Sequence, residues 1–450
     1  MIKRCLLLTI ICLLTVAASR GQGLFESAQD EPDQSADKGI EFNGFARGSA
    51  YGGSEYYDYS SVFGEFCLQG KLSHANTFLY SDLRFRGGVN FDEEYVKLQL
   101  REVYAGYNSD KFDLFLGNQI IAWGRTDGFN PTNNITPNDY FFLTSDMDDQ
   151  KLSNFMLRLK YRFSSAIDIE LIGIPLYLPS NYRFDLFDLG EGVSFDEAAL
   201  PEKSFGNGSV ATRLNFEFSK IGFSVSWFRG YDPFYGFNVD TVDFATGEPV
   251  VTNSATPYRK NTLGADFTLP LNSWILRAEA AYKLTDNYEQ IMYIPNPDIA
   301  YVFGVEHVFW GVTTILQYVG KYTLDYTELQ VPVLSDPFDP LAQMQYAVEM
   351  IEYESALFNR KMFYQQEETN HAIMLLLSKA IAYDTWNIEL GGYYNITSEE
   401  LMIRPRVTWR ISDALAASIG GSYMSGQDKS IFDYSAPVLS GAFLELKASF

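Results

Sequence analysis

The feature that constrains this sequence most is a recurrent alternation of apolar and polar residues, interrupted at short distances by turn-forming residues. Successive side chains of a strand point to opposite faces, so each such segment predicts a β-strand with one apolar face. About eighteen strands are expected. They lie at 41–52, 61–73, 76–89, 94–108, 111–124, 153–163, 166–177, 207–218, 219–231, 257–269, 272–285, 298–309, 311–325, 368–380, 382–394, 398–411, 413–425 and 438–450.

The links between these segments alternate in length. Every second link is very short, and the long links all fall in the other set: 125–152, 178–206, 232–256, 286–297, 326–367 and 426–437. A soluble sandwich has no reason to place every long loop at one end, whereas outer-membrane barrels have tight periplasmic turns and long external loops. The sequence therefore predicts an all-β fold, a transmembrane antiparallel β-barrel in the outer membrane of a Gram-negative bacterium.

The two ends of the chain agree with export to that membrane. Residues 1–21 combine Lys3 and Arg4 with a short apolar run and small residues, which is typical of a signal peptide. Residues 22–40 are acidic and polar, so we expect a flexible periplasmic tail before a barrel at 41–450. The last strand, 438–450, is apolar on one face and ends in Phe450, which resembles the sorting signature of outer-membrane barrels.

The amino-acid composition further limits the classes of protein to which this chain could belong. Aromatic residues make up 16% of the chain, as expected for a barrel with aromatic girdles at both interfaces. The net charge of −23 repels nucleic acid, so that class of partner is excluded. After removal of the signal peptide only Cys67 remains, so no internal disulfide is possible.

Strand phase assigns the charged side chains to the lumen, because a charge on the lipid face costs about 2–4 kcal/mol near the membrane midplane. The same phase turns Lys283 and Lys321 inward. The bases that would set anion selectivity are Arg84, Arg86, Lys97, Arg101, Arg158, Lys160, Arg162, Arg404, Arg406 and Arg410. The alternative is that these bases pair with inward acids such as Glu65, Glu170 and Glu389 and only stiffen the wall.

One loop carries more information than the others. Strand 111–124 passes into a segment dense in Gly, Pro, Asn and Asp, which predicts an ordered fold-in at the extracellular end of the lumen. With Leu100–Tyr104, this stretch resembles a porin-like outer-membrane family of unassigned function, similar in layout to eighteen-stranded alginate-export barrels. The resemblance covers Gln119, Trp123, Arg125, Asp127, Asn130 and Asp139. The length and turn signals of the loop predict that it forms a constriction or binding ledge, or else a rigid cap that closes the gap between strands.

Other sites are less well supported by the sequence. Residues 341–357 predict a short amphipathic helix that packs on the barrel mouth or loops. The acids Asp146, Asp148 and Asp149 match no defined calcium loop, so solvated acids are favoured and no metal or cofactor is expected. Of three histidines only His371 is placed for catalysis, and no serine is placed beside it, so the chain is not expected to be an enzyme.

These observations predict a channel for passive passage of small solutes, with anions favoured. The expected surroundings are outer-membrane lipid and lipopolysaccharide. One alternative is an exit duct for an anionic polysaccharide or amphiphile, working with periplasmic export partners. Another is a non-conducting barrel whose loops bind a surface partner. The sequence leaves open whether loops 125–152 and 326–367 plug or gate the lumen.

Overall fold

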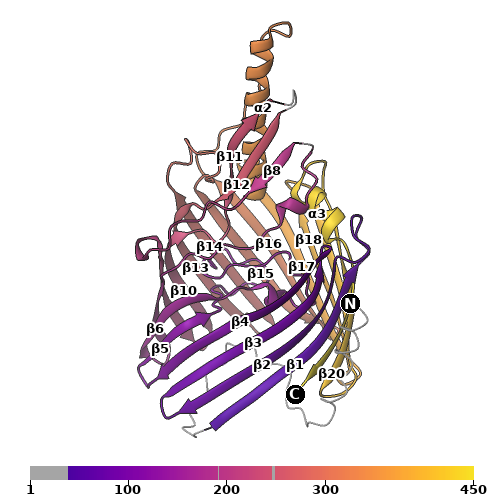
Figure 1. Cartoon of the computed structure of the whole chain (residues 1–450). Helices are drawn as coiled ribbons and strands as arrows, with labels where there is room; N and C mark the ends of the chain where they lie inside the picture. The colour runs from indigo at the N-terminus through magenta and orange to yellow at the C-terminus, as the bar shows by residue number, and fades with distance from the viewer. Residues whose placement is uncertain (1–38, 191, 246–248) are drawn as a thin grey trace.

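The computed structural model describes residues 39–190, 192–245 and 249–450, and shows one closed eighteen-stranded barrel capped at one end by loops (Figure 1). The predicted signal peptide, and all but the last two residues of the predicted acidic tail, lie outside these ranges. Each barrel strand pairs antiparallel with its neighbours, and β1 pairs with β21 to close the sheet, with Arg47 opposite Lys447. Closure leaves no unpaired sheet edge for a membrane to solvate.

The eighteen barrel strands correspond one to one with the predicted segments. They are β1 (Gly39–Gly52), β2 (Ser61–His74), β3 (Thr77–Asn90), β4 (Glu93–Asn108), β5 (Phe112–Gln119), β6 (Asn154–Ser164), β7 (Ile167–Ile174), β9 (Ser209–Phe218), β10 (Ile221–Tyr231), β13 (Arg259–Leu271), β14 (Trp274–Thr285), β15 (Asp298–Phe309), β16 (Val312–Thr323), β17 (Thr369–Ile381), β18 (Trp386–Asn395), β19 (Glu400–Arg410), β20 (Leu415–Ser425) and β21 (Gly441–Ser449). The predicted fold class is confirmed.

Several predicted boundaries are wrong. Strand β5 ends at Gln119 instead of residue 124, and β7 ends at Ile174 instead of residue 177. The last strand begins at Gly441, because the preceding residues form helix α3 (Ile431–Leu439). The Ser430 side chain caps this helix by accepting a hydrogen bond from the Asp433 backbone N–H, and the helix buries Ile431 and Val438. Tertiary burial therefore outweighs the alternation that suggested a strand there.

The long loops carry structure of their own at the extracellular end (Figure 1). The segments predicted as loops 178–206 and 232–256 contribute β8 (Val193–Asp196), β11 (Gly236–Asp243) and β12 (Val250–Thr256), which form a small second sheet. Short 3-10 turns lie at Met147–Gln150, Phe184–Leu186 and Phe205–Asn207. Helix α2 (Pro340–Met362) is longer than predicted and projects from the barrel mouth.

The C-terminal end of α2 is the end that packs on the mouth. Asn359 exchanges two hydrogen bonds with the backbone of Phe237 in β11, at 2.7 and 2.8 Å. Beneath it, buried residues from several loops form an aromatic roof. The roof comprises Phe91, Phe141, Phe184, Phe187, Tyr235, Phe237, Met362, Ala372, Tyr393, Ile431, Phe432 and Val438.

The outer face of the barrel is apolar. On β4, Val96 and Leu98 are 75% and 67% exposed, whereas the neighbouring Arg101 is 9% exposed. An apolar exterior around a charged interior is the inverse of a soluble protein and matches an outer-membrane barrel. No helix in the described residues is both long and apolar enough to cross a membrane.

Candidate functional site

The segment from residue 120 to 153, here called the inward loop, leaves the wall after β5 and crosses the lumen. A bulge in β4 starts it: Asp82 pairs with Glu102 while Leu83 pairs with Leu100, so Arg101 is the extra residue. As a result, two adjacent charged side chains, those of Arg101 and Glu102, both point into the lumen. Glu102 accepts a 2.9 Å hydrogen bond from the Ile120 backbone N–H, and Arg101 donates to the carbonyls of Asp148 and Asp149. The bulge holds both ends of the loop.

The outward course of the loop is anchored by two buried carboxylates. Trp123 is 2% exposed and its indole N–H donates to Glu170 of β7 at 2.7 Å. Glu279 of β14 accepts hydrogen bonds from the backbone N–H and hydroxyl of Thr132 at 2.8 and 2.7 Å. Gly124, with φ +111°, lies against the same carboxylate, and a Cβ there would come 2.5 Å from its Oε2. Glycine is required at this position on both counts.

Arg125 and Asp127 reach the periplasmic half of the opposite wall. The Arg125 guanidinium donates to Asp266 at 2.6 Å and pairs with Glu217, the penultimate residue of β9. Asp127 lies 3.3 Å from Arg277, near the periplasmic start of β14. The prediction that these residues sit at the extracellular end of the lumen is therefore wrong. The wall residues that bind Arg125 and Asp127 lie nearer the periplasmic end of the barrel.

The returning half of the loop ends in a second cluster, here called the arginine anchor: Asp149 with Arg47, Arg84 and Arg101. Asp149 lies 2.8 Å from both Arg47 and Arg84, and 3.5 Å from Arg101. Burial alone would raise the pKa of Asp149, but the three guanidinium groups hold it well below its usual range. Asp149 is thus a mostly buried structural ion, with its side chain 13% exposed, rather than the solvated acid that the sequence suggested.

Most of the predicted selectivity residues have acidic partners on the wall. Arg84 and Arg86 pair with Glu65, Arg158 with Glu170, Lys160 with Asp168, Arg162 with Asp113 and Arg406 with Glu389. Arg410 has an interaction partner as well. Arg404 contacts Met147 of the inward loop, and Lys97 is an exposed residue of β4. This arrangement matches the paired-wall alternative over most of the set.

The remaining loop residues of the prediction have local contacts. Gln119 donates to the carbonyls of Gly117 and Met156, at 3.4 and 3.3 Å. Asn130 contacts the Thr126 hydroxyl at 2.9 Å. Asp139 accepts from the Asn181 side chain at 3.0 Å, and burial raises its pKa. These contacts fix the turns of the loop.

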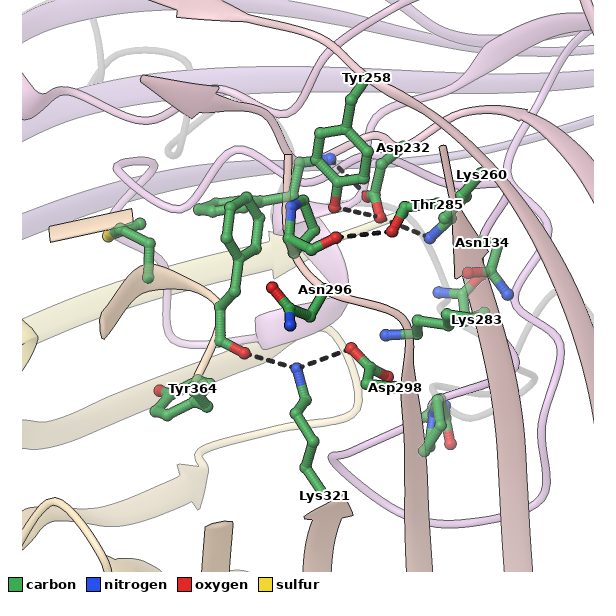
Figure 2. Close-up of a pocket in the computed structure, with 17 residues that line it drawn as sticks. Asn134, Asp232, Tyr258, Lys260, Lys283, Thr285, Asn296, Asp298, Lys321 and Tyr364 are labelled. Atoms are coloured by element: carbon green, nitrogen blue, oxygen red, sulfur yellow. Dashed lines mark hydrogen bonds and ion pairs between the residues drawn. The ribbon is translucent and has the colours of Figure 1, made fainter. Parts of the chain in front are cut away.

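A cavity of about 190 Å³ lies between the inward loop and the extracellular loops, and we call it the lysine pocket (Figure 2). Its floor is Asn130–Asn134, and its lid includes Asn296 and Phe363. Its wall is made by the extracellular ends of β13 to β16. The wall contributes Lys260, Lys283, Lys321, Thr285 and Asp298.

The three lysines of this pocket differ in their partners. Lys260 lies 2.6 Å from Asp232, and Lys321 lies 3.3 Å from Asp298. Lys283 points into the cavity and makes no hydrogen bond or ion pair with any residue in the described ranges (Figure 2). Burial would raise the pKa of Asp232, but the nearby ammonium groups of Lys260 and Lys283 hold it below its usual value. The pocket therefore carries three ammonium groups against two carboxylates.

The prediction placed Lys283 and Lys321 in the lumen but did not single them out, and it missed Lys260. A usable signal was present: the three lysines occur at the extracellular ends of strands that are close together in the barrel order. His371, the one catalytic candidate, has its ring nitrogen 2.6 Å from the Tyr318 hydroxyl.

No family model and no curated protein matches the chain. Several solved barrels match it over almost their whole length. OccAB3 of Acinetobacter baumannii has a TM-score of 0.53 at 9% identity and covers 91% of this chain and 99% of its own. OccAB4 of the same organism gives 0.52 at 10% identity, over 93% and 99%. OccK2 (OpdF) of Pseudomonas aeruginosa, solved in complex with glucuronate, gives 0.51 at 8% identity, over 91% and 97%.

The chain has a porin-like fold. With its apolar outer band, this fold places the protein in the outer membrane as a multi-pass β-barrel. None of the three barrels named above is described as an alginate exporter, so they give no support to the resemblance in layout to alginate-export barrels. At this level of identity the likeness concerns the fold.

Proposed function

We propose that this protein is an outer-membrane channel for the passive passage of small, anionic solutes. The observation that carries the proposal is the inward loop, which narrows a wide barrel without being a separate plug domain. An eighteen-stranded barrel has a lumen wide enough for water unless loops occupy it. The loop is held to the wall at both ends, where Ile120 bonds to Glu102 and Asp149 pairs with Arg84. A loop held in this way sets a fixed constriction within that lumen.

Two observations support anionic solutes. The lysine pocket carries one more positive than negative side chain, and Arg404 adds a guanidinium that contacts Met147. Rings of basic side chains favour anions in a pore. OccK2, which shares the fold, was solved in complex with glucuronate, an anionic sugar.

A polymer duct is less well supported. The inward loop contacts β7, β14 and β18 on its way out, and β19, β21 and β1 on its way back. A polysaccharide would have to thread past a segment held to the wall at all of these places.

A non-conducting barrel that binds a partner remains the second candidate, because one extracellular arm is unusually apolar. In the segment before and at the start of α2, Val333, Phe338 and Leu341 are 83%, 92% and 76% exposed. Exposed apolar groups that cluster on one arm are typical of interaction surfaces.

Single-channel recording in planar bilayers tests the proposal. The purified barrel should give ohmic conductance and a reversal potential that shows preference for chloride over potassium. Arg404→Glu should move that potential toward cation preference, by on the order of 10 mV within the ~59 mV per decade limit for a monovalent ion. Lys203→Glu, the same charge change in an external loop, is the matched control and should leave it unchanged.

Reversal of Arg406 and Arg410 together with Arg404 should enlarge the shift if all three line the ion path. Absence of conductance from a correctly folded barrel would exclude the channel and favour the partner-binding candidate. Conductance with an unchanged reversal potential in Arg404→Glu would place that side chain outside the ion path.

A further inference from the structure

We propose that the lysine pocket is a binding site for a small hydroxylated carboxylate, with Lys283 as the residue that binds the carboxylate. The inference rests on the proposed passage of anionic solutes and names where one class of them binds. The pocket is a candidate because its polar groups are incompletely satisfied by the protein.

The charge balance leaves room for one anionic group. Lys260 is paired with Asp232, and Lys321 is shared between Asp298 and the carbonyl of Phe363, at 3.3 and 2.5 Å. The third ammonium group, that of Lys283, has no such partner among the described residues and faces the cavity (Figure 2). An anion placed there would pair with Lys283 in an environment less polar than water, where the attraction is stronger.

The pocket also presents acceptors that lack donors. Asp298 is 4% exposed, and its Oδ1 has no hydrogen-bond partner in the described structure, although its Oδ2 faces Lys321 and Gln365. The buried Oδ1 of Asn133, on the floor, is also without a donor. Buried acceptors are normally satisfied, by protein or by a ligand. Hydroxyl groups on the bound solute would supply donors to them.

The cavity limits the size of the solute. The accessible space in the cavity amounts to about 190 Å³. Space of this size accommodates one sugar-sized unit. A solute with a carboxylate at one end and hydroxyl groups at the other would match Lys283 on one side and Asp298 with Asn133 on the other.

The site is also built to keep its shape. Its floor is tied to Glu279 through Thr132, and its wall hydroxyl, Thr285, donates to the carbonyl of Pro295 at 2.6 Å. The Asn296 side chain donates to the carbonyls of Leu324 and Asp325, which leaves its oxygen available as an acceptor. Preorganisation of this kind lowers the cost of binding.

Titration calorimetry on the full-length barrel in detergent tests the proposal, with D-glucuronate, D-glucose and inorganic phosphate as probes. Glucuronate should bind, and glucose, which has the hydroxyls without the charge, should bind at least about tenfold more weakly. Lys283→Gln should weaken glucuronate at least about tenfold. The matched control Lys203→Gln removes a lysine from an external loop and should have no effect.

Asp298→Asn separates recognition of hydroxyls from attraction by charge. It makes the pocket more positive, so phosphate should bind as well or better, whereas glucuronate should bind more weakly because an acceptor is lost. Since Asp298 pairs with Lys321, its variant is compared only if its unfolding temperature is near that of the parent. Lys283→Gln removes no hydrogen bond or ion pair of the described structure and needs no such condition.

Equal binding of glucuronate by Lys283→Gln, or equal binding of glucose and glucuronate, would overturn the assignment. If phosphate bound as tightly as glucuronate and Asp298→Asn had no effect on glucuronate binding, the proposed recognition of the solute hydroxyls would be overturned. Binding that depends on Lys283 in a barrel without conductance would defeat the proposed channel and leave the pocket standing. Conductance without such binding would defeat the pocket alone.

Discussion

The arginine anchor and the lysine pocket both gather three cationic side chains inside one barrel, but they are built in opposite ways. In the anchor, Arg47, Arg84 and Arg101 converge on Asp149, and Arg47 lies 2.8 Å from Glu65 as well. In the pocket, the third lysine makes no hydrogen bond or ion pair with the described residues. The comparison indicates that pairing, and not the sign of the charge, separates groups that hold the loop from groups left for a solute.

The choice of cation fits this division. A guanidinium group offers several donors in a fixed plane and can bind two carboxylates or carbonyls at once. Arg101 uses this property to hold two consecutive carbonyls, those of Asp148 and Asp149. An ammonium group on a flexible stem adapts more easily to a ligand that comes and goes. Arginine therefore suits the permanent contact and lysine the exchangeable one.

The largest expected effect comes from removing the centre of the anchor. Asp149→Ala leaves Arg47 and Arg84 buried without this partner, and breaking a buried ion pair typically costs 3–5 kcal/mol, so we expect a loss of about that size. Thermal unfolding of the purified barrel, followed by circular dichroism, measures it.

Asp148→Ala is the matched control for this experiment. Its side chain is 72% exposed and pairs only with Lys151 in the next turn, so a change below about 1 kcal/mol is expected. Asp149→Asn keeps the shape of the side chain while removing its charge, and should fall between the two. Equal stability of the Asp148 and Asp149 variants would show that the anchor does not hold the loop.

Acid should weaken the same contact, and the sign follows from the pKa of Asp149. The folded-state pKa is depressed by the three arginines below the ordinary carboxyl value of 3.8. The stability from this group is therefore fully present above pH 3.8 and is lost as the pH falls through the folded value. The unfolding temperature of the parent should drop below that pH more steeply than that of Asp149→Asn. Parallel curves would mean that Asp149 does not titrate with folding.

The barrel itself could be predicted from the sequence because its information is local. Strand phase depends on alternation within some ten residues. The length of each loop indicates whether it lies on the periplasmic or the extracellular side of the membrane. For the same reason the inward orientation of Arg84 and Arg158 follows from the sequence alone. Their partners Glu65 and Glu170 lie on adjacent strands, so the paired-wall alternative could be predicted too.

The depth of the inward loop could not be predicted in this way. Its position is set by contacts between residues far apart in the chain, such as Thr132 with Glu279 and Arg125 with Asp266. Helix α3 escaped prediction for a related reason, since burial of Ile431 and Val438 among other loops decides its conformation. The lysine pocket depends on both the barrel order and that loop as a floor.

The smallest expected effect on stability is that of Lys283→Gln, and it completes the contrast with Asp149. No hydrogen bond or ion pair in the described structure is lost, so the free energy of unfolding should change by less than about 0.5 kcal/mol. Removing the Lys283 ammonium group relieves its repulsion of Lys260 and Lys321 and also removes its attraction to Asp232, so the two effects offset each other. Thermal unfolding without solute measures this change. A loss as large as that of Asp149→Ala would mean that Lys283 is a structural ion, and the distinction between the two clusters would fail.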